Sequence, residues 1–477
     1  MNIHWIDLLI FIVYLIAMLC VGWYFLSKNK TKDDYYVGGR NMSAGHIGLS
    51  VVATDVGGGF SIGLGGLGFT MGISGSWMLF TGLLGAWLSA VLLIPKIYPI
   101  AKKHHFLSFP EALQFFYNKK VALIAGIISF IGYIGFTSSQ ILAGAKLATA
   151  TFPAISLSNA VLIMGIIAVV YTVIGGIKAV IYTDTIQWII LMLGLICIGI
   201  PIGYIKLGGW EVISSTLPAS HLSLSNISGS QMINWFFTIV PIWFIGMTLY
   251  QRIYSCKDEQ TAKKAWRIAG LFEWPIMAFM GVILGMFAKV ALDQGLFTEI
   301  GYAPEAAMDA ELGLPLFLKQ ILPVGLMGLM MSAYFSAIMS TADSCLMAAS
   351  GNLMTDILAV VKKSWAESIK LSQWVTLIIG AMGIYIALQM TEVLSLMLQS
   401  YAFMVSGLLV PVIMMLYLKK PSPVAAIWSM FVGGSTSLLL MASDVNLPYK
   451  LDPIVAGIAL SFLVFVLVQK TRKNVAA

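Results

Sequence analysis

Long runs of apolar residues, separated by short polar segments, fill almost all of this 477-residue sequence. A membrane-spanning helix needs about 20 consecutive apolar residues, and lipid leaves helices as the structure that satisfies the backbone of such runs. Thirteen spans are predicted, at about 5–26, 43–72, 74–98, 121–151, 158–179, 183–205, 231–250, 268–291, 322–350, 371–391, 393–418, 423–442 and 453–470. The pattern therefore predicts an all-α membrane protein.

The second apolar run, residues 43–75, cannot cross a membrane as one unbroken helix. Asp55 lies near its middle, and Gly57, Gly58 and Gly59 follow almost at once. Each glycine weakens a helix by roughly 1 kcal/mol relative to alanine, and a carboxylate at membrane depth is costly unless it finds a partner or water. A glycine-rich packing face is the alternative interpretation, but it leaves Asp55 unexplained. We therefore expect a broken helix that lines a binding cavity walled by protein.

A second interruption is predicted in the seventh span, at Pro241 and again near Gly246. Spans two and seven each begin a set of five, and because five is odd the two sets start from opposite sides of the membrane. Interrupted segments at matching positions of two inverted halves indicate a binding site. The expected organisation is a five-plus-five inverted repeat with a broken first helix in each repeat. Its parts are a peripheral first helix and inner loop (1–42), the first repeat (43–210), the second repeat (211–418), and two peripheral helices with an inner tail (419–477).

Composition and charge support a membrane location. The chain is 59% hydrophobic and 10% charged, with a mean hydropathy of +0.90. Its net charge of +7 does not indicate nucleic-acid binding, because the basic residues cluster in short loops between spans, as the positive-inside rule requires. That distribution predicts a multi-pass protein of the cell membrane with the N-terminus outside and the C-terminus inside. The first run has no Lys or Arg before it, so we interpret it as a span rather than a signal peptide.

Two connecting segments are expected to form helices of their own. The acidic outer loop, 293–320, ends in a short helical pattern placed to lie over a cavity mouth, and the inner loop that begins at Arg252 is expected to form a surface helix. No P-loop and no H-E-x-x-H motif occurs, and the four cysteines are too dispersed for a disulfide framework or a metal site. We therefore expect a protein that is not an enzyme.

Ionisable residues within the spans are functional candidates by default, and the sequence has five: Asp55, Asp184, Glu273, Asp343 and Lys146. No partner for Glu273 can be named from the sequence, and it is assigned either a buried hydrogen bond or a role in coupling. Lys146, near the outer end of its span, is expected to extend toward water. If Asp184 meets Asp343, the two could hold a second cation or share a proton.

Span nine carries the richest group of polar residues. Ala337, Ser340, Thr341 and Ser344 share one helix face, and Ser336, Ser340 and Asp343 form an adjoining stripe. Hydroxyl and carbonyl oxygens with one or two carboxylates can replace the hydration shell of a hard cation such as sodium. Small hydroxyl residues also hold membrane helices together, but Asp343 within the stripe favours a cation site.

Four motifs together make the chain resemble the sodium/solute symporters, a family that includes the bacterial proline, sialic acid and galactose carriers and the choline carrier. They are DYYVGGR after the first span, ATDVGGGFSIG with GISGSW in and after the second, YTVIGGIKAVIYTDTIQ across the fifth and sixth, and SAIMSTADS in the ninth. The family fold is a five-plus-five inverted repeat with thirteen spans. The resemblance implies alternating access, in which sodium flowing inward drives uptake of a small-molecule solute across the lipid bilayer. No nucleic acid and no obligatory protein partner is implied.

The resemblance also assigns roles to individual residues. A first sodium site would use carbonyl groups of Ala53, Val56 and Ala337 and hydroxyl groups of Ser340 and Thr341. A second, as in the sialic acid carriers, would use Asp184, Ser340, Asp343 and Ser344. Asp55 matches the acidic residue of the proline carriers and is assigned to coupling. By position, the substrate pocket would be lined by Gly58, Gly59, Phe60, Phe136, Gln140, Trp243, Thr248 and Tyr401.

The function expected from these observations is sodium-coupled import of a small polar organic solute. Choline is disfavoured because its aromatic cage needs a tryptophan where this chain has Asp55, and proline because Phe136 replaces a tyrosine of the proline carriers. Broken-helix ends bind a carboxylate or an ammonium, which favours an amino acid or small organic acid. A sugar held by Gln140 and Thr248 is the alternative. Proton coupling through Asp55, Asp184 or Asp343 also stays open, as does a non-transporting sensor, which usually carries a signalling domain that this sequence does not show.

Overall fold

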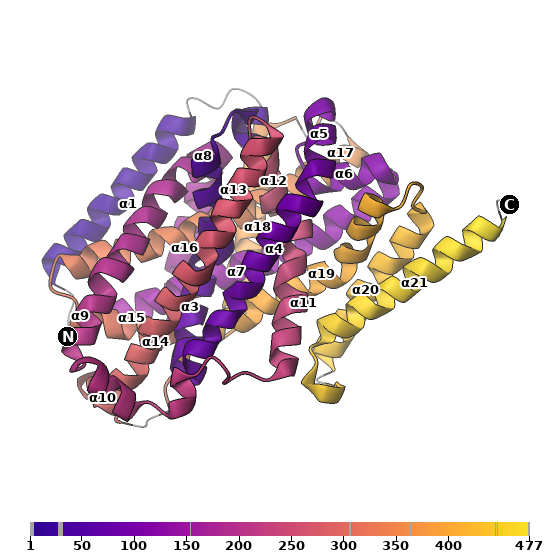
Figure 1. Ribbon diagram of the computed structural model, residues 1–477. Helices are drawn as coiled ribbons and strands as arrows, with labels where there is room; N and C mark the ends of the chain where they lie inside the picture. The colour runs from indigo at the N-terminus through magenta and orange to yellow at the C-terminus, as the bar shows by residue number, and fades with distance from the viewer. Residues whose placement is uncertain are drawn as a thin grey trace.

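The computed structural model describes residues 4–26, 32–152, 154–304, 307–362, 364–365, 367–443, 445 and 447–475. Regular structure in these ranges is helical, apart from one isolated β-bridge between Met42 and Cys256. The helices form one bundle, with α1 on one flank and α20 and α21 on the opposite flank (Figure 1). The prediction of an all-α protein is confirmed.

The long helices are α1 (Trp5–Leu26), α3 (Ala44–Met71), α4 (Trp77–Leu92), α7 (Lys119–Thr151), α8 (Leu157–Gly194), α11 (Gly229–Ile245), α14 (Ala278–Asp293), α16 (Leu326–Gly351), α18 (Ile369–Ala387), α19 (Val393–Tyr417), α20 (Pro423–Ala442) and α21 (Pro453–Val475). Shorter α-helices are α2 (Lys32–Val37), α5 (Ile94–His104), α6 (Phe109–Phe116), α9 (Ile200–Lys206), α10 (Gly209–Thr216), α12 (Met247–Ser255), α13 (Glu259–Leu271), α15 (Ala310–Ile321) and α17 (Ala359–Val361). Single turns of other helix types are η1 (Gly38–Arg40), η2 (Gly72–Ser76), η3 (Leu195–Gly199), η4 (Ala219–Leu222), η5 (Phe272–Met277), η6 (Thr298–Ile300), η7 (Asn352–Leu358) and η8 (Pro448–Lys450).

Within the described ranges, nine helical stretches are long and apolar enough to cross a membrane, and the bent pair of α11 and α12 makes a tenth. Two shorter apolar helices, Trp5–Ala17 and Leu157–Val173, fall in predicted spans as well. One of the nine stretches, Ile62–Leu92, joins parts of two predicted spans. The multi-pass architecture is confirmed, whereas the number thirteen and the side on which each terminus lies stay predictions.

The predicted break in the second span is present. Helix α3 runs from Ala44 to Met71, but within it Gly57 has φ 41° and ψ −168°, far from helical values. A positive φ is a conformation that glycine adopts without the steric cost paid by other residues. The backbone therefore changes direction two residues after Asp55.

The seventh predicted span is also broken, at one of the two places expected. Helix α11 ends at Ile245, α12 begins at Met247, and the two meet at an angle of 43°. Gly246 between them has an extended backbone. The break predicted at Pro241 is wrong, because α11 runs through that residue. Membrane helices can absorb the one backbone hydrogen bond that a proline removes.

Helix α8 contains two antiparallel stretches that match two predicted spans, 158–179 and 183–205. Near one end of α16, Met330 packs against Gly194, while Thr172 donates a hydrogen bond to Asp343 farther along. Met164 shares a cavity wall with Met331. Both ends of α8 therefore lie near the start of α16, so the stretch before residue 174 and the stretch after residue 179 run in opposite directions.

The buried centre of the bundle is α16. From Met330 to Gly351 every residue of this helix is buried, and it packs against α1, α3, α7, α8 and α18. The flanking helices instead expose large apolar side chains, as helices facing lipid do; examples are Trp23 of α1, Leu439 of α20 and Leu467 of α21. The polar residues of α16 are thus enclosed by protein rather than by lipid.

The two expected loop helices have different outcomes. Helix α15 forms in the predicted outer loop, and Asp309 and Glu311 at its start line a cavity of about 910 Å³ between α3, α11 and α19. Helix α13 forms in the predicted inner segment and exposes Lys264 and Arg267, but the segment does not lie wholly on the surface. Arg252 belongs to α12 and is fully buried, and Trp266 of α13 is also fully buried. The basic residues of this segment resemble those of a loop, but the Arg252 side chain has buried acceptors that only the tertiary structure brings to it.

Candidate cation and substrate sites

The break in α3 lies directly against α16. A Cβ atom on Gly57 would lie 2.3 Å from Thr341 Oγ1, so the glycine permits this close approach. The Thr341 hydroxyl lies 2.9 Å from the Ala53 carbonyl oxygen and 3.2 Å from that of Ala337, and it can donate to either. Three of the oxygens assigned to the first sodium site therefore converge in a buried place.

The other two residues assigned to the first site differ in their placement. The Ser340 hydroxyl donates a hydrogen bond to Asp184 Oδ1, on the neighbouring helix α8. The side chain of Val56 lies outside the described residues, as do those of Gly58, Gly59 and Phe60, which were assigned to the substrate pocket. The geometry thus unites Ala53, Ala337 and Thr341, with Ser340 linking this group to Asp184.

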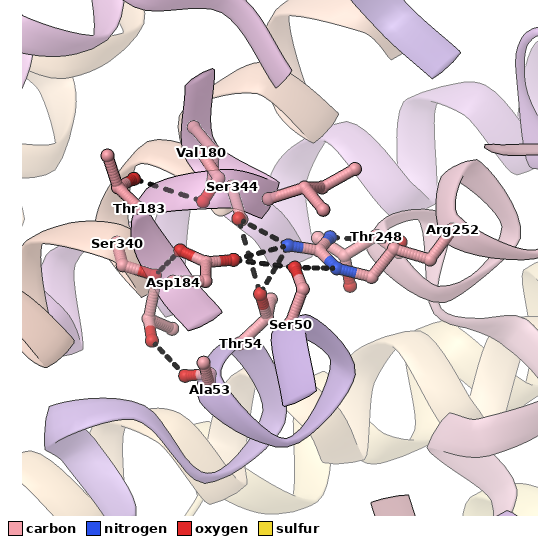
Figure 2. A network of polar contacts seen from close by, with 12 residues as sticks. Ser50, Ala53, Thr54, Val180, Thr183, Asp184, Thr248, Arg252, Ser340 and Ser344 are labelled. Carbon is pink, nitrogen blue, oxygen red and sulfur yellow. Dashed lines mark hydrogen bonds and ion pairs between the residues drawn. The ribbon is translucent and has the colours of Figure 1, made fainter. Parts of the chain in front are cut away.

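Arg252 is the central member of a buried polar network beside this group (Figure 2). Its Nη2 donates to Thr54 Oγ1 at 2.5 Å, to Ser344 Oγ at 3.0 Å and to Asp184 Oδ2 at 3.3 Å. Its Nε donates to Ser50 Oγ at 3.0 Å. Arg252 is 0% exposed and Asp184 1%, so the guanidinium joins α12 to α3, α8 and α16 in the buried interior.

Three of the four residues assigned to the second sodium site belong to this network. Asp184, Ser340 and Ser344 surround or adjoin the Arg252 guanidinium, which already supplies a positive charge there. Asp343 lies apart from them and accepts a hydrogen bond from Thr172 at 2.5 Å. Its Oδ2 has no hydrogen-bond partner within the described part of the chain. The sequence leaves open whether Asp184 meets Asp343; in the structure Asp184 pairs with Arg252, and the hydrogen bond of Asp343 goes to Thr172.

Asp55 and Glu273 form a second buried polar feature at the break. The two carboxyl groups lie near each other, and Asp55 is 6% exposed while Glu273 is 0% exposed. The sequence offered no partner for Glu273 because η5 and α3 are far apart in the chain. The structure brings Glu273 near Asp55, although neither Glu273 oxygen has a hydrogen-bond partner among the described residues.

Several residues assigned to the substrate pocket are buried together. The rings of Phe136 and Tyr401 meet edge to face, with centroids 4.9 Å apart. Tyr133, which no sequence motif singled out, stacks near Phe136 and its hydroxyl lies 3.1 Å from Thr248 Oγ1. Gln140 donates to Ser139 at 3.2 Å on the same helix.

Trp243 lies on another side of the break. Its indole packs on Gly85 of α4 and meets the Trp266 ring edge to face, 6.3 Å between centroids. The nearby cavity of about 910 Å³ is lined by Gly63 of α3, Thr238 of α11 and Ala402 of α19. Phe136, Trp243 and Tyr401 are not among the described residues that line this cavity.

Lys146 does not extend to water as expected. It is 2% exposed, and its Nζ lies 2.5 Å from Asp309 Oδ2 and 2.6 Å from Glu311 Oε2. Glu311 also accepts hydrogen bonds from the backbone N–H groups of Val393 and Leu394 at the start of α19. These acids come from α15, which folds over the end of α7, so Lys146 is neutralised within the protein.

Known transporters are similar to nearly the whole chain in sequence and in structure. The osmoregulated proline transporter OpuE of Bacillus subtilis is 25% identical over 97% of this chain and 94% of its own length. The sodium/glucose cotransporter 1 of Oryctolagus cuniculus is 26% identical over 76% of this chain and 59% of its own length. A Na⁺-coupled sialic acid symporter, solved in a substrate-bound outward-open state, superimposes with a TM-score of 0.81 at 22% identity and covers 98% of both chains.

A second solved structure, of a nucleobase-cation-symport-1 family transporter, shares the fold more distantly, with a TM-score of 0.57 at 13% identity. The model of the sodium:solute symporter family matches residues 35–433. That match contains the broken helix α3, the Arg252 network and all of α16. The chain therefore belongs to the sodium:solute symporter family, whose coupling ion is sodium.

Proposed function

We propose that this protein imports a small polar organic solute by alternating access, with sodium binding between α3 and α16. The observation that carries the proposal is the contact of the Thr341 hydroxyl with the Ala53 carbonyl oxygen, at 2.9 Å, beside the break at Gly57. A bound sodium ion would link the two helices by contacting the Thr341 hydroxyl and the Ala53 carbonyl oxygen, which in its absence share the hydroxyl proton in a hydrogen bond. Sodium would thereby favour one arrangement of the two helices, and solute binding would then close the cavity.

Uptake into proteoliposomes, with and without an inward sodium gradient, tests the proposal. A panel containing amino acids, small organic acids and sugars should include at least one solute whose accumulation requires sodium. The double variant Ser340→Ala/Thr341→Ala is expected to raise the sodium concentration for half-maximal uptake by about tenfold or more, the loss expected for about 1.4 kcal/mol of binding energy.

Ser332→Ala is the matched control for that variant. Ser332 is a buried hydroxyl residue on α16, but it donates only to Gly328 of its own helix, at 2.6 Å. Its loss is expected to leave the sodium dependence unchanged. An unaltered sodium dependence in the double variant would remove Ser340 and Thr341 from the site, and uptake that follows pH but ignores sodium would select proton coupling through Asp55, Asp184 or Asp343.

A second sodium ion is proposed at Asp184, Ser340 and Ser344, with Asp343 as a further ligand if α8 and α16 rearrange. Arg252 holds one Asp184 oxygen at 3.3 Å, so a second ion would share that carboxylate with the guanidinium. The solute proposed is an amino acid or small organic acid, with a sugar as the alternative. The named solutes of the relatives, proline and glucose, fall in both of these classes.

A further inference from the structure

Helix α1 is fastened along α16 by three side chains that share one of its faces. Asp7 Oδ1 accepts hydrogen bonds from two backbone N–H groups at the start of α16, both at 2.7 Å. Phe11 meets Phe335 edge to face, with ring centroids 5.3 Å apart. Tyr14 donates a hydrogen bond to Ser336. Because Asp7, Phe11 and Tyr14 lie at positions i, i+4 and i+7, α1 follows the helix that carries the candidate sodium ligands.

A cavity of about 130 Å³, called here the α1 cavity, lies between α1, α8 and α16 beside the Tyr14–Ser336 contact. One water molecule needs roughly 10–15 Å³ of such space, so the cavity has room for a small ion together with water. Its polar wall is made of Tyr14, Tyr171, Gln187, Ser336, Ser340 and Asp343. Oxygen atoms from three helices therefore face one space.

One acid faces the α1 cavity without a counter-charge. Asp343 is 0% exposed, and its Oδ1 accepts a hydrogen bond from Thr172 at 2.5 Å. Its Oδ2 has no hydrogen-bond partner in the described part of the chain. No lysine, arginine or histidine occurs among the described residues that line the cavity. A carboxylate enclosed at membrane depth is stabilised by a positive partner, and hydroxyl oxygens beside it suit a sodium ion.

Tyr14 both closes this cavity and holds one of its oxygens in place. Its neighbours Val13 and Ile16 are exposed on the outer face of α1, so Tyr14 stands between the cavity and the lipid side of the bundle. A hydroxyl oxygen has two lone pairs, so Ser336 can accept the Tyr14 hydrogen bond and still contact an ion. Ser336 lies about one turn before Ser340, which is assigned to the first sodium site and also lines the cavity.

We propose that Tyr14 is a positioning residue for sodium, because it holds Ser336 in the wall of the α1 cavity, where a sodium ion binds beside Asp343. The inference rests on the proposed function and adds to its sodium machinery a helix outside the residues that the family model matches, 35–433. Asp343, Ser336 and Ser340 already share this cavity. The second ion therefore has a place there without any rearrangement of α8 and α16.

Binding of radiolabelled sodium to the full chain in detergent, measured beside its melting temperature in potassium, tests this role. Tyr14→Phe keeps the ring and removes only the hydroxyl group. It is expected to raise the sodium concentration for half-maximal binding by about three- to tenfold, the loss expected for one neutral hydrogen bond. Ser336→Ala should have a similar effect. The double variant should bind sodium no more weakly than Ser336→Ala alone, because Tyr14 acts through Ser336.

Phe11→Leu is the matched control on the same face of α1. Phe11 packs on Phe335, but it lines a neighbouring cavity of about 100 Å³ and is not among the described residues that line the α1 cavity. This variant should lower the melting temperature in potassium, because α1 packs less closely, and leave the sodium affinity unchanged. The two readouts thus separate a positioning role from packing.

Equal sodium affinity in Tyr14→Phe and a sodium-binding parent overturns the proposal, while the symporter proposal stands. A loss of affinity in Phe11→Leu as large as that in Tyr14→Phe also overturns it, because the effect would then come from packing alone. A double variant in which the two single losses add would show that Tyr14 does not act through Ser336 and would overturn it too. A parent protein that binds no sodium contradicts the proposed function, and with it this inference.

Discussion

The buried Asp184–Arg252 pair gives the sharpest prediction about stability. Replacing Arg252 with glutamine removes a guanidinium that donates to Ser50, Thr54, Asp184, Ser344 and the Thr248 carbonyl oxygen. It leaves the Asp184 carboxylate buried, with only hydroxyl donors. Removing one partner of a buried ion pair costs about 3–5 kcal/mol, because the charge that remains is uncompensated.

Unfolding of the purified protein in detergent, followed by loss of helical circular dichroism, measures this cost. The double variant Asp184→Asn/Arg252→Gln removes both charges and should be more stable than Arg252→Gln alone. A double-mutant cycle, which compares it with the two single variants, will give this difference as a coupling energy. Arg267→Gln is the matched control, since Arg267 is exposed on α13, and it should change stability by no more than about 0.5 kcal/mol. An Arg252→Gln variant as stable as this control, or a double variant whose loss equals the sum of the two single losses, would refute the reasoning.

Three further predictions follow from single contacts. Gly57→Ala forces a side chain into positive φ and places its Cβ within 2.3 Å of Thr341 Oγ1. The variant should therefore lose about 2–4 kcal/mol of stability and need more sodium for half-maximal uptake. Uptake kinetics equal to those of the parent would contradict this. Lys146→Met leaves Glu311 without its ammonium partner at 2.6 Å. Hydrogen exchange in α15, measured by mass spectrometry, should become faster by about tenfold or more. Unchanged exchange would show that the ion pair does not hold α15 in place. Asp343→Asn should lower the Hill slope for sodium toward one if a second ion binds, and a slope of one in the parent protein would make the second site unnecessary.

The sequence predicted the features that depend on local composition. Gly57 follows a buried acid within an apolar run, and only a break explains that combination, so the position of the bend in α3 was foreseeable. The same reasoning failed at Pro241, because a proline weakens a helix without obliging it to break. Gly246, the other place predicted for a break in that span, is where the helix is interrupted.

The sequence could not predict which polar residues meet between helices. Helical periodicity placed Ser340, Asp343 and Ser344 on nearby faces of α16, but it gave no information on which residues of α8 or α12 face them. Arg252 was assigned to an inner loop because basic residues mark loops, although it is fully buried in contact with Asp184. Arg252 lies only six residues after the predicted break near Gly246, and this position was the one sequence feature that could have indicated a buried role. Glu273 and Asp55 likewise come near each other only through the fold.

Direct binding of radiolabelled sodium to the purified protein tests the central claim, that oxygens of the broken α3 and of α16 jointly hold the coupling ion. The parent protein and Ser332→Ala should bind sodium with the same affinity. Thr341→Ala, which removes the hydroxyl 2.9 Å from the Ala53 carbonyl oxygen, should bind it at least about tenfold more weakly. Equal sodium affinity in all three proteins would contradict the account.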